Sequence, residues 1–278
     1  MAGLTVAYQL ARAGVPVTVL EKESRVGGLA RSFQRGDFVF DIGPHRFHTD
    51  DEKVSEFIHL VLKGDELSVS RRSGVWMFNH YHDWPLTQRT LLKLPPPIML
   101  RSALDLFTRP APQDDSFEDY ILAMYGRTLY EIFFRPYTTK FIKLDPSQVH
   151  SDWARSGVDR AVIDKQVKMN SLLEVLKSTL LPKAVKTNFI YPASGGISVF
   201  SEKLAGMIRA LGGEVLTDAP ATGLETRDGR ITAVRHPAGV VEAGHVIWSA
   251  PITKAAELLG VADPGLRYLS IVCFNFEI

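Results

Sequence analysis

One cysteine, Cys273, is all that the 278-residue sequence contains. A single thiol excludes an internal disulfide and a cysteine metal cluster, and it fits the reducing cytoplasm, where we expect the protein to be located. Neither sign of charge predominates, because 32 basic residues balance 31 acidic ones and leave a formal charge of +1. Nucleic acid is therefore not an expected partner, since a phosphate backbone requires a broad basic surface.

Long apolar runs are also missing. No stretch reaches the roughly 18 consecutive apolar residues that predict a transmembrane segment. The segment from Leu91 to Phe107 is amphipathic, which leaves peripheral membrane contact as an alternative to the more usual packing on a protein core. Apolar residues make up 45% and charged residues 23%, a balance typical of a folded protein with a sizeable core. The length favours two domains.

The first 20 residues predict a helix, a tight turn and a strand. Apolar residues recur at helical spacing over residues 2–13, and Gly14 is expected to end the helix. The β-branched run at 15–20 is typical of a buried parallel strand. A parallel crossover needs a strand before its helix, so we expect the first strand of this α/β unit to be missing from the sequence.

Composition divides the rest of the sequence into two kinds of region. Strand and helix patterns alternate in residues 1–65 and 186–250, which predicts an α/β domain, whereas the remainder is largely helical. We predict strands within 38–43, 75–84, 189–192, 212–217, 230–236 and 244–251, and helices at 51–62, 117–134, 172–181 and 197–211. Three prolines at 95–97 are expected to break any helix there.

Glu21 is the first candidate binding residue. It ends the strand predicted at 15–20 and lies 18 positions after Gly3. In dinucleotide-binding folds, an acidic residue about 20 residues past the glycine turn accepts hydrogen bonds from ribose hydroxyls. A solvated glutamate at a strand end is the alternative, and the spacing by itself does not separate the two.

A second candidate is the turn in RVGGLARS. Gly27 and Gly28 are adjacent, so backbone amides can approach a phosphate there without interference from Cβ atoms, and Arg31 can add positive charge. An isolated Gly-Gly pair is usually only a turn. Beside Glu21, however, this turn predicts a site for a dinucleotide whose diphosphate needs neutralising.

The run AGLTVAYQLARAGVPVTVLEKESRVGGLARSF resembles the FAD-binding start of the amine oxidase and protoporphyrinogen oxidase superfamily. FDIGPHRFH, FEDYILAMYGRTLYEIFFRPYTTKF, YPASGG and HVIWSAP are similar too, so the resemblance extends over nearly the whole chain and includes the branch similar to UDP-galactopyranose mutase. It implies an FAD-dependent oxidoreductase that transfers a hydride from a small-molecule substrate to the flavin.

The resemblance also implies a fold and a set of site residues. The fold would be α/β: a Rossmann-like FAD-binding domain at 1–65 and 186–250, and an inserted, largely helical α+β substrate domain at 66–185 and 251–278. The family pattern assigns the FAD contacts to Gly3, Glu21, Lys22, Arg25, Gly27, Gly28, Leu29, Arg31, Gly43, Pro44, His45 and Ala221. His45 and Arg46 are the catalytic candidates, and Ser249 to Pro251 match the crossing between the two domains.

Compared with the family, the sequence looks truncated at both ends. The first strand and the first phosphate-binding turn would precede Ala2, and the family continues beyond Ile278. We therefore expect this chain to bind FAD weakly or not at all, although its parent architecture is that of a flavoprotein.

A metal site formed by histidines is an alternative to a histidine that contacts a flavin. Imidazoles two or three residues apart can share a face, and the sequence has four at such spacings, His45, His48, His80 and His82. No acidic or cysteine cluster accompanies them at recognisable spacing, so we predict no metal.

Arginines of the helical region offer a substrate site. Arg135, Arg155 and Arg160 could grip a carboxylate or diphosphate, but pairing with local acids such as Glu131 or Asp159 is the favoured explanation. Two functional alternatives stay open beside the oxidoreductase. One is a non-redox flavoenzyme similar to UDP-galactopyranose mutase, in which these arginines would hold a nucleotide diphosphate, and the other is a non-catalytic fragment that has lost FAD binding.

Overall fold

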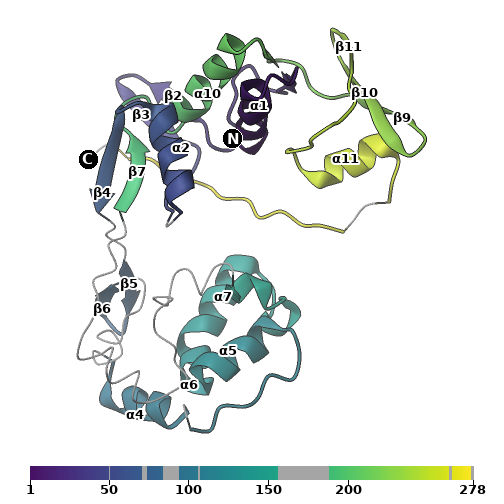
Figure 1. Ribbon diagram of the computed structural model, residues 1–278. Coiled ribbons are helices and arrows are strands. Elements are labelled where there is room, and N and C mark those ends of the chain that lie inside the picture. The colour runs from purple at the N-terminus through teal and green to yellow at the C-terminus, as the bar shows by residue number, and fades with distance from the viewer. Residues whose placement is uncertain are drawn as a thin grey trace. The chain divides into compact units, whose positions relative to one another are not determined.

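The computed structural model describes residues 1–49, 51–70, 74–83, 94–105, 107–155, 188–262 and 265–276. Two compact units make up the chain, and they are shown in Figure 1. Unit 1 combines Met1–Val69 with Asn188–Ile278, whereas unit 2 is the single segment Ser70–Thr187. Unit 1 is thus built from two segments that are far apart in the sequence.

Unit 1 is a mixed helix and strand structure. Its described elements are α1 (Ala2–Arg12), β1 (Thr18–Leu20), β2 (Ser32–Arg35), β3 (Phe38–Asp41), α2 (Glu52–Leu62), β4 (Glu66–Ser70), β7 (Asn188–Pro192), α10 (Ser198–Ala210), β8 (Glu214–Leu216), β9 (Gly223–Arg227), β10 (Arg230–His236), β11 (Gly239–Glu242) and α11 (Ile252–Leu259). The helices predicted at 2–13, 51–62 and 197–211 are confirmed, with bounds that differ by at most one residue at either end.

Two helix–strand pairs form the centre of unit 1. The strands β1 and β8 are parallel, with Val19 opposite Val215, and the helices that precede them, α1 and α10, pack on each other (Figure 1). Each helix is followed, two residues after its end, by a glycine with positive φ, Gly14 at 77° and Gly212 at 85°. Glycine adopts this conformation without the steric cost that a side chain would incur, so both turns can be short. The parallel strand predicted at 15–20 is confirmed for Thr18–Leu20.

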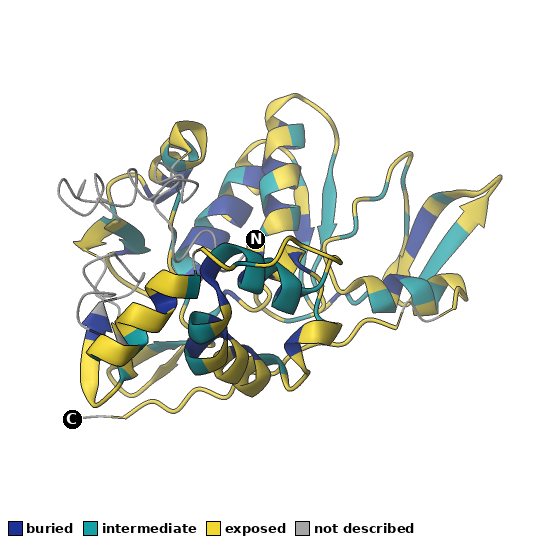
Figure 2. Ribbon diagram, turned by 90° about the horizontal axis from the view of Figure 1, so that it is seen from below, coloured by how far each residue is buried: buried dark blue, intermediate teal, exposed yellow. Residues whose placement is uncertain are grey.

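The core of unit 1 lies between α1, α2, α10 and β8. Leu62, Leu204 and Ile208 are fully buried there. Each belongs to an apolar stripe on its helix, in which apolar residues recur every three or four positions. Figure 2 shows the buried residues in dark blue on helices whose opposite side is exposed. Aromatic rings extend the core, because Phe47 and Phe200 approach within 4.7 Å between ring centroids.

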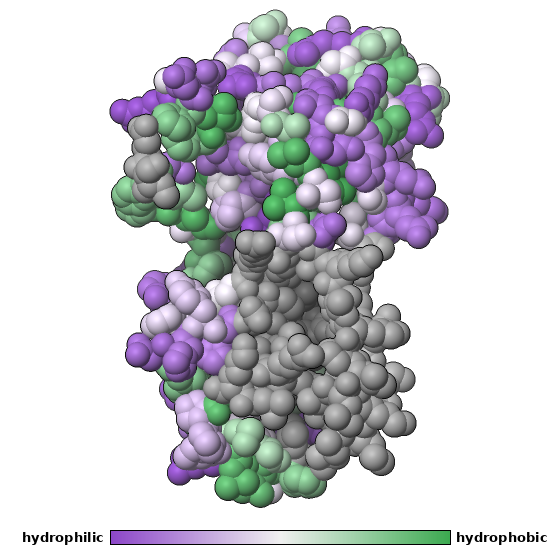
Figure 3. Space-filling model, turned by 90° about the vertical axis from the view of Figure 1, so that its left-hand side faces the viewer, coloured by the Kyte–Doolittle hydropathy of each residue, from purple (hydrophilic) through white to green (hydrophobic). Residues whose placement is uncertain are grey.

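Further strand pairs belong to unit 1. β2 and β3 form an antiparallel hairpin, β10 pairs antiparallel with both β9 and β11, and β4 pairs with β7. Phe47 forms an isolated bridge with Ile190 of β7, so the chain that follows β3 runs beside β7. On the face shown in Figure 3, hydrophilic and hydrophobic residues are intermixed over much of the described surface.

Unit 2 has a strand hairpin followed by short helices. Its described elements are β5 (Gly74–Met77), β6 (His80–Asp83), α4 (Pro96–Asp105), α5 (Phe117–Tyr125), α6 (Arg127–Leu129), the π-helical turn η1 (Tyr130–Phe134), α7 (Arg135–Ile142) and the 3-10 turn η2 (Pro146–Gln148). A separate core forms from Phe117, Ile121, Tyr125, Tyr130, Phe133, Phe134 and Ala154. Among the described residues of the chain, no helix is long and apolar enough to cross a membrane.

Three sequence predictions differ from the structure. The prolines at 95–97 begin α4 instead of breaking a helix, because proline is tolerated in the first turn, where its missing N–H has no partner anyway. The helix predicted at 117–134 is interrupted at Gly126, whose φ is 82°. No strand is assigned over 244–251, where Ile247 is 58% exposed and no described strand is paired with it.

Residues 251–278 are grouped with unit 1, and their predicted assignment to the substrate domain stays a prediction. The grouping reflects local packing: α11 contacts β9, and the Cys273 thiol donates to the Ile42 carbonyl oxygen at 3.6 Å. The helix predicted at 172–181 lies outside the described residues.

Candidate functional site

The carboxyl ends of β1 and β8 form the first part of the candidate site. Beyond the strands the pairing continues, because the Glu21 N–H donates to Leu216 O at 2.8 Å and the Ala219 N–H donates to Glu21 O at 2.9 Å. Ala221, two residues further on, is partly buried in this connection to β9. In open α/β sheets, ligands bind outside the carboxyl ends of parallel strands, so Glu21 and Ala221 lie where the sequence predicts a nucleotide.

Glu21 also lies near the amino end of α1. Burial lowers the pKa of the Met1 amino group, and the Glu21 carboxylate opposes that shift by attraction. The carboxylate is held by the Glu23 N–H, which donates to Oε1 at 3.0 Å. One carboxylate oxygen is thus oriented by the backbone, and the residue is only partly buried. Such an acceptor can bind ribose hydroxyls beside a helix N-terminus.

The Gly27–Gly28 turn has two consecutive glycines with positive φ. Gly27 is buried with φ of 120°, and a Cβ there would lie 2.8 Å from Ala30 O. Gly28 has φ of 63° and open space where its Cβ would be. Gly28 and Leu29 are exposed residues, Leu29 at 78%, and neither backbone N–H has a hydrogen-bond partner among the described residues. These amides can therefore donate to an anion.

The basic residues around this turn are engaged by protein groups. Arg31 Nε donates to Gly28 O at 2.8 Å, and its guanidinium lies 3.6 Å from Glu23. Arg25 donates to Ser32 O at 3.3 Å and pairs with Glu202 of α10. Lys22 is 3.6 Å from Glu23 as well. Arg25 therefore shapes the turn, while Arg31 lies at its edge with its side chain partly exposed.

Asp41, a residue that the sequence patterns did not single out, is the centre of a polar cluster behind the turn. It accepts hydrogen bonds from Ser32 Oγ and Tyr191 Oη, each at 2.7 Å. The Ile197 N–H donates to the same carboxylate at 3.1 Å. These partners lie up to 156 residues away in sequence, so no local spacing could have indicated them.

The segment Gly43 to Arg46 follows β3. The His45 ring folds back on Gly43, with Nδ1 3.2 Å from Gly43 O, and Pro44 is exposed. The Arg46 guanidinium stacks over the Phe189 ring of β7, 4.0 Å from its centroid. Arg46 is thus held on β7, which leaves His45 as the better candidate for contact with a flavin ring.

Gly3 lies against Ser249. A Cβ at Gly3 would lie 2.6 Å from Ser249 Oγ and 3.5 Å from Ser249 Cβ. The residues predicted to mark a crossing, Ser249 to Pro251, therefore pass the first turn of α1. A side chain at position 3 would therefore require the Ser249 hydroxyl to move.

This contact gives a prediction with an internal control. Gly3→Ala should lower the free energy of unfolding by about 1 kcal/mol, because Ser249 must move. In the Gly3→Ala/Ser249→Ala double variant the short contact is gone, and alanine is favoured over glycine in a helix by about 1 kcal/mol, so stability should return to the wild-type value or exceed it. Urea denaturation of the single and double variants measures both. Additive losses would contradict the contact.

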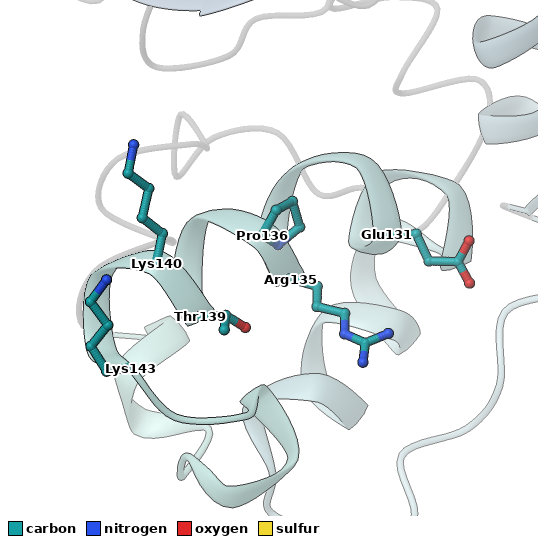
Figure 4. A pocket seen from close by; sticks show the side chains of 6 residues that line it. All are labelled: Glu131, Arg135, Pro136, Thr139, Lys140 and Lys143. Atoms are coloured by element: carbon teal, nitrogen blue, oxygen red, sulfur yellow. The ribbon is translucent and has the colours of Figure 1, made fainter.

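Unit 2 holds an open, shallow pocket on α7 (Figure 4). It is lined by Glu131, Arg135, Pro136, Thr139, Lys140 and Lys143 and has a volume of about 680 Å³. Arg135 pairs with Asp145 at 3.8 Å, and Arg155 donates to Asp152 at 3.2 Å. Both arginines thus have local acidic partners, although these are not the two acids expected from the sequence. Arg160 lies outside the described residues.

The four histidines weighed as metal ligands have other contacts. His48 lies edge-on to Phe189 at 5.5 Å, and His82 is buried with Nε2 3.0 Å from Met77 O. His80 belongs to the hairpin of unit 2, whereas His45 and His48 belong to unit 1. Within the described part of the chain, no group of three or more histidine, cysteine, aspartate or glutamate side chains could hold a metal ion.

Comparison with known proteins identifies the family. The model of the family of flavin containing amine oxidoreductases matches residues 1–267. The chain belongs to this family. The resemblance seen in the sequence is confirmed, and FAD is the cofactor of this architecture. The fold is likewise a mixed helix and strand fold of the FAD-dependent amine oxidase type.

Individual relatives come from more than one branch. The chain is 43% identical over 79 residues to the L-amino-acid oxidase of Crotalus adamanteus, a match that covers 28% of this chain and 15% of the oxidase. It is 26% identical over 155 residues to the "Probable UDP-galactopyranose mutase" of Klebsiella pneumoniae, covering 53% of this chain and 40% of that protein.

A solved structure of reduced UDP-galactopyranose mutase superimposes with a TM-score of 0.74 at 19% identity, over 92% of this chain and 55% of that one. At this identity the likeness shows the fold alone. The chain spans about half the length of that solved structure, and its matches to the curated relatives cover smaller shares.

Proposed function

We propose that unit 1 binds FAD across the carboxyl ends of β1 and β8 and the turn at residues 27–32, as a Rossmann-like domain does. The supporting observation is the Gly27–Gly28 turn: Gly28 and Leu29 are exposed, their N–H groups lack partners among the described residues, and a Cβ at Gly27 would lie 2.8 Å from a backbone oxygen. Glu21 would accept from ribose hydroxyls, and the Gly28 and Leu29 amides and Arg31 would hold the diphosphate. Gly3 would let Ser249 pack against the first turn of α1 beside the cofactor.

The activity we propose is that of an FAD-dependent oxidoreductase of the amine oxidase type acting on a small molecule in the cytoplasm. Bound flavin would supply the acceptor for a hydride from a C–N or C–C bond. Unit 1 would orient the cofactor, and His45 would contact the ring or the substrate. Unit 2 would provide substrate contacts, which is the role that the sequence predicts for the helical region. The oxidase relative supports this class of chemistry.

Flavin reduction tests the activity. Two proteins would be compared: the 278-residue chain, and an extended form that also includes any in-frame coding sequence on either side of it. Each would be loaded with FAD and mixed without oxygen with a panel of L-amino acids and primary amines. We expect at least one substrate to bleach the visible flavin absorbance, and His45→Ala to slow that bleaching. His48→Ala, on the same segment but held against Phe189, is the matched control.

The same assay separates the mutase alternative. Conversion of a nucleotide sugar by reduced flavin, with no net oxidation of any substrate, would overturn the oxidoreductase proposal and favour the branch of the mutase relative. FAD binding without either reaction would favour a non-catalytic protein.

A further inference from the structure

The glycine turn is joined to α10 by a reciprocal pair of serines. The N–H of Ser32, the residue that ends the turn, donates to Ser198 Oγ at 2.7 Å, and the Ser198 N–H donates to Ser32 Oγ at 3.0 Å. Both residues are buried, with exposed fractions of 6% and 1%. Two hydrogen bonds in opposite directions fix both the separation and the orientation of the two backbones. Ser198 is the first residue of α10, so the end of the turn is fastened to the start of that helix.

Asp41 completes this attachment. Its Oδ1 accepts from Ser32 Oγ at 2.7 Å and from the Ile197 N–H at 3.1 Å, and its Oδ2 accepts from Tyr191 Oη at 2.7 Å. One carboxylate thus bonds the end of the turn, the end of β7 and the amino end of α10. A carboxylate at a helix N-terminus is stabilised by the exposed N–H groups there. Hydrogen bonds to a charged acceptor are also stronger than neutral ones.

The other side of the turn is held by the next turn of α10. A Cβ at Gly27 would lie 3.2 Å from Ser201 Oγ, and Arg25 pairs with Glu202 while donating to Ser32 O. There is no free space in this contact, because a Cβ at Gly196 would lie 2.3 Å from Ser32 Oγ and 2.8 Å from Asp41 Oδ1. The buried side of the turn is therefore fixed by α10, while Gly28 and Leu29 are exposed and their N–H groups have no partner among the described residues.

We propose that Asp41 and Ser32 are positioning residues for the flavin nucleotide. They hold the turn at residues 27–32 against α10, so that the Gly28 and Leu29 amides are already aimed at the diphosphate before it binds. Preorganised donors bind better, because no ordering of the turn is required at the moment of binding. This inference rests on the proposed FAD site and adds to it two residues that would not touch the cofactor.

The test compares Asp41→Asn and Ser32→Ala with two controls in the extended form. Asp37→Asn removes a similar charge from the exposed tip of the same hairpin, and Val61→Ala weakens the core of unit 1 on α2, where Val61 is 1% exposed. The Kd for FAD is measured by quenching of flavin fluorescence at a temperature well below every Tm, and Tm is measured without FAD. Hydrogen exchange of residues 25–33 reports the order of the turn.

We expect Asp41→Asn and Ser32→Ala to weaken FAD binding by about tenfold each, the size expected for loss of a hydrogen bond that involves a charged group. Exchange at residues 25–33 should be faster in both. Val61→Ala should lower Tm by a comparable amount and leave Kd unchanged, and Asp37→Asn should change neither. Tyr191→Phe, which removes one donor to Asp41, should have an intermediate effect on Kd.

Different results overturn different claims. If wild-type protein binds FAD and Asp41→Asn binds it equally well at a lower Tm, the cluster only stabilises the fold and this inference is wrong, while the proposed site stands. If Val61→Ala weakens binding as much as Asp41→Asn does, the effect is general destabilisation, which also overturns it. If wild-type protein takes up no FAD, both the proposed site and this inference fail.

Discussion

Gly27→Ala should abolish measurable FAD binding and lower the free energy of unfolding by about 2–4 kcal/mol. The φ of 120° at Gly27 lies in the region that side chains rarely adopt, and the new Cβ would lie 2.8 Å from Ala30 O, a backbone atom that cannot rotate away. The turn would have to open, which would displace the Gly28 and Leu29 amides. FAD titration and urea denaturation measure the two effects.

Gly36→Ala is the matched control for this variant. Gly36 also has positive φ, 60°, but lies at the exposed tip of the β2–β3 hairpin with no atom within 4 Å of its Cβ position. We expect it to cost about 1 kcal/mol and to leave FAD affinity unchanged. Equal effects of the two substitutions on affinity would show that the turn at 27–32 has no special role.

Leu204→Ala should destabilise unit 1 by about 3–5 kcal/mol and reduce FAD binding with it. Leu204 is fully buried on α10, the helix that supports both β8 and the glycine turn. A cavity there removes packing between α10 and its neighbours, α1 and α2. Leu211→Ala is the control, because Leu211 caps the same helix and is 47% exposed, and its cost should stay below about 1 kcal/mol.

Phe117→Ala extends this comparison to the other unit. Phe117 is fully buried in the separate core of unit 2, so its loss should cost about 3–5 kcal/mol there. Hydrogen exchange followed residue by residue should show faster exchange in unit 2 for Phe117→Ala and in unit 1 for Leu204→Ala. Faster exchange in both units for either variant would mean that the two cores unfold as one.

Local patterns predicted the elements that are specified by neighbouring residues. The apolar spacing of α1 and α10, their terminal glycines and the β-branched run of β1 all act within one or two turns of the chain, and the structure contains these elements. The prediction at the prolines of 95–97 was wrong because proline is unfavourable inside a helix but not in its first turn.

Contacts between distant segments could not be predicted in the same way. In the sequence, nothing distinguishes Asp41 from any other aspartate at the end of a strand. Only the fold brings Tyr191 and Ile197 into contact with it, from 150 and 156 residues further along the chain. The apolar segment at 244–251 has the composition of a strand but has no paired strand among the described residues. The turn at residues 27–32, by contrast, contains two adjacent glycines that the sequence already indicated as an anion-binding candidate, while the FAD contacts there are implied by the family resemblance and stay a prediction.

The most direct test of the account is the visible absorbance spectrum of the purified protein after FAD has been added and the unbound cofactor removed. The 278-residue chain and the extended form would be measured side by side, each with its Gly27→Ala variant. We predict that the extended form retains the spectrum of protein-bound flavin, and that Gly27→Ala abolishes this spectrum and also removes any flavin that the 278-residue chain retains. Absence of bound flavin from both forms would contradict the claim that unit 1 is built to hold FAD.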